Sequence, residues 1–138
     1  MTDTRLQRIP PAMVDKAWAE GAMRLEDAMH RAASECTGSQ LKLLLMRGEM
    51  ILVQSGALWA AIHPIDHPNK RVLHVYAVAG SGINDDVVLE LWQFAQAIGC
   101  TAITAAADDA TGRLYQRMAF RPVYQMMEFT PINKEPMP

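Results

Sequence analysis

The residues best suited to chemistry are the glycines of the turn Ala79-Gly80-Ser81-Gly82. The turn follows an apolar segment and leads directly into a helix that we expect over 85–98, with Asn84 as its N-cap. The first amides of a helix have no partner inside the helix, and the helix dipole makes this end positive. A glycine turn at a helix N-terminus can therefore hold a phosphate group.

The charges next to this turn oppose an anionic ligand. Asp85 and Asp86 occupy the first turn of the helix, and no Lys or Arg lies between Val72 and Gly112. Two unit charges about 4 Å apart interact by roughly 1 kcal/mol in water, which matches or exceeds the roughly 0.3–1 kcal/mol that a helix dipole contributes. The alternative is that both carboxylates simply stabilise the first turn of the helix.

His74 is the candidate general base. It lies in the apolar segment 71–79, which has no carboxylate, and an imidazole can accept a proton from an amine near neutral pH. A hydrogen-bonded strand histidine is the alternative. Strict alternation along a strand places Tyr76 on the same face as His74.

Other chemistry finds less support in the residues. His63 and His67 are four apart, but the proline after each of them excludes the helix that this metal-ligand spacing needs. The serines lack the context of a nucleophile elbow, and no Gly-Lys-Ser/Thr follows Gly82 as a P-loop requires. Cys36 and Cys100 do not have a metal-ligand spacing, so we expect no metal site. We expect two reduced, buried thiols, and a disulfide between them is the alternative.

Length and composition fit one compact domain. The chain has 138 residues, of which 50% are apolar and 20% charged, the usual balance of a globular protein with its own core. A net charge of -2 without a long basic run argues against nucleic-acid binding. The apolar runs are too short to span a bilayer, and the polar start shows no signal peptide. We expect a single domain over 1–130, a proline-rich tail over 131–138, and no membrane partner.

Helices dominate the first third of the chain. The apolar spacing predicts a short strand over 4–9, a helix over 12–33 that Gly21 either divides or only weakens, and a helix over 38–47 that Gly48 ends.

Strands follow. We expect strands over 50–54 and 57–64, joined by a tight Ser55-Gly56 turn, then a loop over 65–70 with a turn at 66–69. The strand over 71–79 is apolar on both faces, which favours a central position in the sheet.

After the helix over 85–98, the pattern predicts a short buried strand over 102–107. A last helix over 110–118, capped by Asp108 or Asp109, and a final strand over 123–130 complete the order. The fold class is therefore α+β, or α/β in layers, around one central sheet.

From Arg71 onward this order resembles the acetyl-CoA-binding half of the GNAT N-acetyltransferases. That family has a pyrophosphate loop Q/R-x-x-G-x-G/A, a helix, a strand splayed from its neighbour, and a helix ending in Y-x-x-x-G-F. The segment 77–82 matches both glycines but has Ala77 for Gln or Arg, and the segment 115–120 matches Tyr and Phe but has Ala119 for Gly. The resemblance implies a central, mixed, mostly antiparallel sheet flanked by helices on both faces.

The resemblance also implies an acetyl-CoA site. Tyr115 stands where the family tyrosine protonates the departing CoA thiolate, although it could instead pack on the apolar side of its helix. Ala119 either strains a position with positive φ or changes the shape of the helix end. Because of Asp85 and Asp86, we expect acetyl-CoA to bind weakly or not at all. The cofactor-binding residues implied by the loop are Val78, Ala79, Gly80, Ser81, Gly82, Ile83 and Asn84.

A closer resemblance is to small GNAT-like proteins of tailed bacteriophages. It covers 48–53, the segment 60–78 and the turn 80–82. Such proteins are often encoded near virion structural genes, and their acetyl-CoA motif is often eroded. The resemblance therefore implies a phage origin, with localisation in the virion or the host cytoplasm.

Three functions stay open. The first is a non-catalytic GNAT-fold component of a virion or its assembly, without a cofactor, that contacts phage structural proteins or further copies of itself. The alternative is an acetyl-CoA-dependent N-acetyltransferase with Tyr115 as general acid and His74 or water as base. The third is a small-ligand or regulatory binding domain on the same scaffold.

Overall fold

The computed structural model describes residues 5–31 and 36–131. Its centre is a sheet of five strands in the order β1-β2-β3-β4-β5. Neighbouring strands pair antiparallel, except that β4 and β5 are parallel, so the expected mixed and mostly antiparallel sheet is confirmed. The strands are β1 (Gln7–Ile9), β2 (Ile51–Ser55), β3 (Leu58–His67), β4 (Lys70–Ala79) and β5 (Ala102–Ala105).

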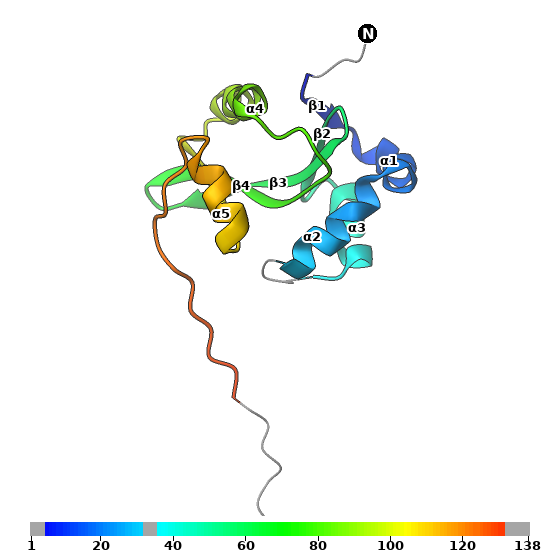
Figure 1. Ribbon diagram of the computed structural model, residues 1–138. Helices are drawn as coiled ribbons and strands as arrows, with labels where there is room; N and C mark the ends of the chain where they lie inside the picture. Colours follow the sequence, from blue (N-terminus) through cyan, green and yellow to red (C-terminus); the bar gives the residue numbers. More distant parts are fainter. Residues whose placement is uncertain (1–4, 32–35, 132–138) are drawn as a thin grey trace, which may run out of the picture.

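Helices cover both faces of this sheet (Figure 1). On one face, α1 (Val14–Glu20), α2 (Leu25–Arg31) and α3 (Gly38–Met46) enclose a core that includes Leu25, Leu41 and Trp59. On the other face, α4 (Asp85–Ala97) packs over a second core that includes Ile62, Leu73 and Leu91. The last helix is α5 (Asp109–Gln116). Among the described residues, no helix is long and apolar enough to span a bilayer.

The helix expected over 12–33 is divided at Gly21. This residue has a φ of +157°, and a Cβ atom there would lie 2.8 Å from the Nε1 of Trp59. A side chain would therefore collide with the core, and the backbone departs from a helix at this point. Single-turn 3₁₀ helices over Pro11–Met13 and Ala22–Arg24 lead into α1 and α2.

The loop expected over 65–70 is wrong, because β3 and β4 form a longer hairpin. β3 continues to His67, and only Pro68 and Asn69 make the turn to β4. β2 pairs with β3 no further than Ile62, so, among the described strands, none covers the edge of β3 at Pro64. An open edge is the place in a sheet that tolerates a proline.

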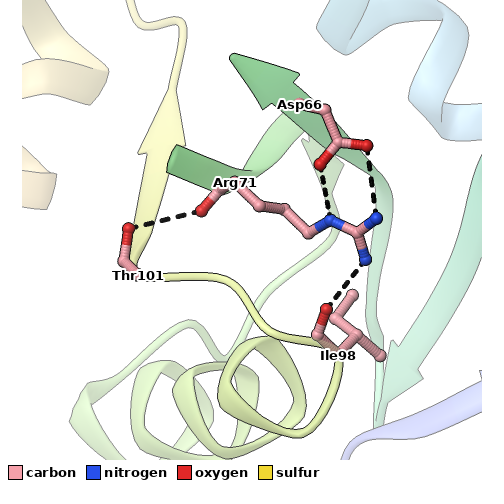
Figure 2. Close-up of polar contacts among 4 residues, drawn as sticks. All are labelled: Asp66, Arg71, Ile98 and Thr101. Carbon is pink, nitrogen blue, oxygen red and sulfur yellow. Dashed lines mark hydrogen bonds and ion pairs between the residues drawn. The ribbon is translucent and has the colours of Figure 1, made fainter. Parts of the chain in front are cut away.

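Arg71 joins this hairpin to α4 and β5 (Figure 2). Its Nε and Nη2 donate to the two carboxylate oxygens of Asp66 at 2.7 and 3.2 Å, and its Nη1 donates to the carbonyl oxygen of Ile98 at 2.9 Å. The hydrogen bond and the charge of the guanidinium lower the pKa of Asp66. The backbone N–H of Thr101 donates to the carbonyl oxygen of Arg71 at 2.9 Å, so β5 begins in register with β4.

Two expectations for the C-terminal third are wrong. The described residues contain no strand over 123–130: after α5 the chain leaves the domain as an extended, exposed segment (Figure 1). β5 ends at Ala105 and is half-buried rather than buried, because it lies at the edge of the sheet. Of the tail expected over 131–138, all but Pro131 lies outside the described residues.

Candidate functional site

β4 and β5 separate toward their C-terminal ends. Their pairing joins Val72–Val75 to Ala102–Ala105, whereas β4 continues to Ala79. Over 77–79, β4 is therefore paired only with β3 within the described chain. An open strand edge presents unpaired N–H and C=O groups that a ligand can use. This separation is the splay that the family resemblance implied.

A β-bulge lies where the two strands separate. Ile62 opposes Val75 and Ala61 opposes Ala77, so Tyr76 is the extra residue of β4. Val75 packs into the core under α4, whereas Tyr76 and Ala77 both pack toward the helices of the other face. A bulge breaks the alternation of a strand and changes the direction of its side chains.

A cavity of about 170 Å³ occupies the splay. One wall is β4 from Val75 to Val78 with Gly80 and Ile83 of the turn. The opposite wall is the segment 106–108 after β5 together with Thr111, Leu114 and Tyr115 of α5. The carboxyl ends of two parallel strands thus form the cavity, which is the usual place for a ligand in such sheets.

A smaller apolar cavity of about 30 Å³ lies beside the first, between the sheet and α4. The two cavities share five lining residues, Leu58, Val75, Val78, Ile83 and Tyr115. Tyr115 therefore lies at the boundary between an apolar cavity and a more polar one.

The end of α5 fixes the position of Tyr115. The N–H of Phe120 donates to the carbonyl oxygen of Tyr115 at 3.1 Å, and the N–H of Ala119 donates to that of Gln116 at 3.2 Å. The rings of Tyr115 and Phe120 lie 5.2 Å apart. These are the two bonds and the apolar contact of a Schellman cap, with Ala119 in the left-handed position at a φ of +69°. The strained alternative for Ala119 is thus the one observed, and the helix end has kept its shape.

The environment of Tyr115 keeps its phenol protonated. The side chain is buried, and desolvation raises its pKa. No hydrogen bond joins its hydroxyl to another residue of the described chain. The side chain is buried with its ring against that of Phe120 and it also borders a cavity, so packing and a place at a cavity are compatible for Tyr115.

The glycine turn is divided between the cavity and the solvent. Of the seven expected cofactor-binding residues, Val78, Gly80 and Ile83 line the larger cavity, Ala79 is buried in the core, and Ser81, Gly82 and Asn84 are exposed.

Close packing against the backbone explains why position 80 is a glycine. A Cβ atom at this position would lie 1.9 Å from the carbonyl oxygen of Ala57, and its φ is +93°. The next glycine differs, because Gly82 has a φ of +103° but nothing within 4 Å of an added Cβ. Close approach of two backbone segments therefore accounts for the first glycine of the motif without a ligand.

The N-terminus of α4 is capped as the sequence predicts. The side chain of Asn84 accepts a hydrogen bond from the N–H of Val87 at 3.0 Å. Asp85 and Asp86 lie exposed in the first turn.

The structure does not bring His74 to Tyr115. His74 borders neither of the two cavities, and its Nδ1 lies 2.9 Å from the Oγ1 of Thr104 on β5. His63 faces His74 across β3 and β4, and its buried Nδ1 has no hydrogen-bond partner among the described residues. In the same part of the chain, no three His, Cys, Asp or Glu side chains come together as metal ligands.

Several solved structures with a similar fold are described as acetyltransferases. A probable acetyltransferase superposes with a TM-score of 0.65 at 15% identity, over 95% of this chain and 99% of its own. An aminoglycoside acetyltransferase from an uncultured soil metagenomic sample, in complex with sisomicin, has a TM-score of 0.65 at 16% identity, over 94% and 96%. An aminoglycoside N-acetyltransferase in complex with CoA has a TM-score of 0.63 at 8% identity, over 91% and 93%.

This chain has the GNAT fold. A scan against protein-family models and a search of curated proteins gave no match. At the identities above, the structural likeness concerns the fold alone.

Asp108 is a residue of the GNAT-fold cavity that sequence reasoning named only as a helix cap. Its side chain accepts a hydrogen bond from the N–H of Thr111 at 2.8 Å, and it lines the larger cavity opposite β4. Its position directly after the strand expected over 102–107 was the available signal, because ligands bind at the carboxyl ends of parallel strands.

Proposed function

We propose that this chain is an acyltransferase that takes its acyl group from a CoA thioester, with Tyr115 as general acid. The observation that carries the proposal is the place of the phenol: Tyr115 borders the cavity between the separated ends of β4 and β5, on a GNAT fold. A solved protein of this fold is an N-acetyltransferase in complex with CoA.

The residues present fit a CoA thioester in part. The open edge of β4 over 77–79 offers backbone groups beside the cavity, and the exposed turn 80–82 leads to the N-terminus of α4. Asp85 and Asp86 reduce the attraction of this helix end for phosphate groups, so we expect weak binding. When bound, a CoA thioester supplies an activated acyl group.

Tyr115 can supply the proton that a departing thiolate needs. Its raised pKa keeps the proton on Oη throughout the neutral range. Proton transfer from a phenol of pKa about 10 to a thiolate whose conjugate acid has a pKa of about 8.5 is energetically unfavourable. The transfer therefore depends on how closely the phenol is positioned to the departing sulfur. The contact with Phe120 and the cap at Ala119 fix that position.

The second proton transfer has two candidate acceptors. His74, the base predicted from the sequence, would need a water molecule between its ring and an amine in the cavity, because it borders neither cavity. Asp108 lines the cavity and carries a carboxylate, which also caps α5 through the N–H of Thr111.

Acetyl-CoA binding and turnover test the proposal. We expect acetyl-CoA to raise the melting temperature, because a ligand that binds the native state stabilises it. Release of free CoA in the presence of a panel of primary amines should fall at least tenfold in Tyr115→Phe, while the melting shift by acetyl-CoA stays. The matched control is Tyr124→Phe, since Tyr124 is exposed. Wild-type release rates in Tyr115→Phe would overturn the role of Tyr115, and no melting shift at millimolar acetyl-CoA would overturn the proposal.

A second candidate is a non-catalytic protein of a phage particle or of its assembly, which acts through protein contacts. The exposed apolar side chains over 123–129 favour it, because such side chains mark contact surfaces. Mass spectrometry of purified virions tests this candidate and its localisation: stoichiometric presence supports it, and absence from virions contradicts it.

A further inference from the structure

The smaller of the two cavities is apolar throughout. Strands β2 to β5 form one wall and the first half of α4 forms the opposite wall, and among the lining residues only Tyr115 has a polar side-chain atom. A buried water needs two to four polar partners, and the described residues that line this cavity offer at most that one phenol. The cavity is therefore suited to hydrocarbon rather than to water.

The size of this cavity sets how much hydrocarbon fits. Its volume is about 30 Å³, and one water-sized sphere takes up roughly 10–15 Å³ by the same measure. About two to three methyl or methylene groups therefore fill it. An empty void lacks packing contacts with the side chains around it, so a ligand that fills the cavity binds more tightly than one that leaves it empty.

The apolar cavity lies where an acyl chain would begin. Tyr115 borders both cavities, and in the function proposed above its phenol protonates the sulfur of a thioester. The acyl carbonyl carbon is bonded to that sulfur, so the first carbons of the chain lie within a few bonds of the phenol. The polar side chains of Asp108 and Thr111 line the larger cavity, where they suit an amine acceptor. The apolar cavity is thus the space that is left for the chain.

We propose that the acyl group is a short saturated chain, with butyryl preferred to acetyl. The inference rests on the proposed function and names its donor. Butyryl has three carbons beyond the carbonyl carbon and acetyl has one, so only the longer chain fills the cavity. In the transfer, the amine nitrogen bonds to the acyl carbon as the C–S bond breaks, and Tyr115 protonates the sulfur, which leaves with the electron pair. The proton of the amine passes to Asp108 or, through water, to His74.

Calorimetry with a series of CoA thioesters tests the proposal. Acetyl-, propionyl-, butyryl-, hexanoyl- and octanoyl-CoA carry the same phosphates, so the ratios of their affinities report the acyl chain alone. Each buried methylene should tighten binding about fourfold, so butyryl-CoA should bind about ten- to fifteenfold more tightly than acetyl-CoA. Hexanoyl- and octanoyl-CoA should bind no more tightly than butyryl-CoA, because the cavity is then full.

Three variants locate the chain. Ala60 lines only the smaller cavity, so Ala60→Val should abolish the preference for butyryl over acetyl. Without ligand, its melting temperature should stay the same or rise, because the added methyl groups fill empty space. Val88→Ala enlarges the cavity and should shift the preference to hexanoyl-CoA. Val72→Ala is the matched control: Val72 is buried but lines neither cavity, so the affinity ratios should not change.

Several results would overturn the inference and leave the proposed function standing. Equal affinities along the series, or tightest binding by acetyl-CoA, would mean that the chain does not enter the cavity. Affinities that rise steadily to octanoyl-CoA would place the chain on an open surface. An unchanged preference in Ala60→Val would place it elsewhere, and a marked fall in the melting temperature of this variant would show that the space is already filled. Failure of every thioester to bind would instead overturn the proposed function.

Discussion

The ring of Tyr115 lies 5.2 Å from the ring of Phe120, and the N–H of Phe120 donates to the carbonyl oxygen of Tyr115 at 3.1 Å. The two aromatic residues of the Y-x-x-x-G-F pattern are thus the contact pair of a helix cap. The position directly before the Phe, here Ala119, is the left-handed one. A motif associated with catalysis therefore has a structural function, which is to hold the phenol still at the border of the cavity.

Ala119→Gly should stabilise the protein. α3 and α4 end with the same pair of hydrogen bonds, but their left-handed residues are Gly48 and Gly99, whereas α5 has Ala119 at a φ of +69°. An L-residue there costs roughly 1–2 kcal/mol, part of which the flexibility of glycine in the unfolded chain offsets, so we expect a gain of about 1 kcal/mol. Urea unfolding measures it. Gly99→Ala is the reverse substitution at the equivalent position of α4 and serves as the control. It should lower the free energy of unfolding by a similar amount, because a Cβ atom there meets nothing within 4 Å and only the backbone strain remains. A loss of stability in Ala119→Gly would contradict the strained cap.

Tyr115 should make stability fall at alkaline pH. Its pKa is raised in the folded protein by desolvation, so the folded state retains the phenol proton where the unfolded state loses it. The contribution is complete below the unfolded pKa of about 10 and is lost as the pH rises through the folded value. Urea unfolding from pH 9 to pH 11 should therefore show a steeper decline in the wild type than in Tyr115→Phe. Parallel declines would mean that Tyr115 ionises freely in the folded state.

The sequence predicts the layers of this fold better than its edges. Helical spacing and two-sided apolar strands identify α4, β4 and the sheet because these patterns depend on local period and burial. The sequence cannot show that β3 continues past Pro64, because that depends on where β2 stops pairing. Nor can it show that β5 is an edge strand, since the final strand expected over 123–130 is not present among the described residues.

In the candidate site, too, the sequence predicts the local features but not those that depend on tertiary structure. Tyr115 and the glycine turn could be located from spacing, because a helix end and a tight turn are local features. The placement of His74 outside the cavities and of Asp108 inside the larger one depends on the separation of β4 from β5, which is a tertiary feature. The bulge at Tyr76 likewise has no signature in the sequence.

Removing the charge of the α4 N-terminus should strengthen acetyl-CoA binding. Asp85→Asn with Asp86→Asn removes two carboxylates, each of which repels an anion about 4 Å away by roughly 1 kcal/mol in water. Calorimetry at low salt should show binding tighter by about five- to thirtyfold, and the gain should shrink at high salt. Glu20→Gln with Asp27→Asn, on α1 and α2, is the control and should change nothing. Unchanged affinity in the α4 variant would show that the two carboxylates do not weaken the site.

Arg71 should matter more to stability than Asp66. The arginine binds both the carboxylate of Asp66 and the carbonyl oxygen of Ile98, so Arg71→Ala loses two contacts where Asp66→Asn weakens one. The folded pKa of Asp66 is lowered, so its contribution is present above the unfolded pKa of about 3.9 and is lost as the pH falls through the folded value. Urea midpoints should therefore separate Asp66→Asn from the wild type at pH 7 and bring them together in strong acid. Arg71→Ala should remain the less stable protein at both pH values, and equal midpoints for the two variants at pH 7 would contradict the role of Ile98.

The two glycines of the turn should respond differently to alanine. Gly80→Ala places a Cβ atom 1.9 Å from the carbonyl oxygen of Ala57, whereas Gly82→Ala places one in open space, although both positions have positive φ. We expect Gly82→Ala to cost about 1–2 kcal/mol from backbone strain alone. Gly80→Ala should cost about 2–5 kcal/mol, because overpacking against the backbone adds to the strain. Urea unfolding measures both. Equal losses would show that the close approach between the turn and Ala57 relaxes without cost, and would remove the structural explanation for the first glycine of the motif.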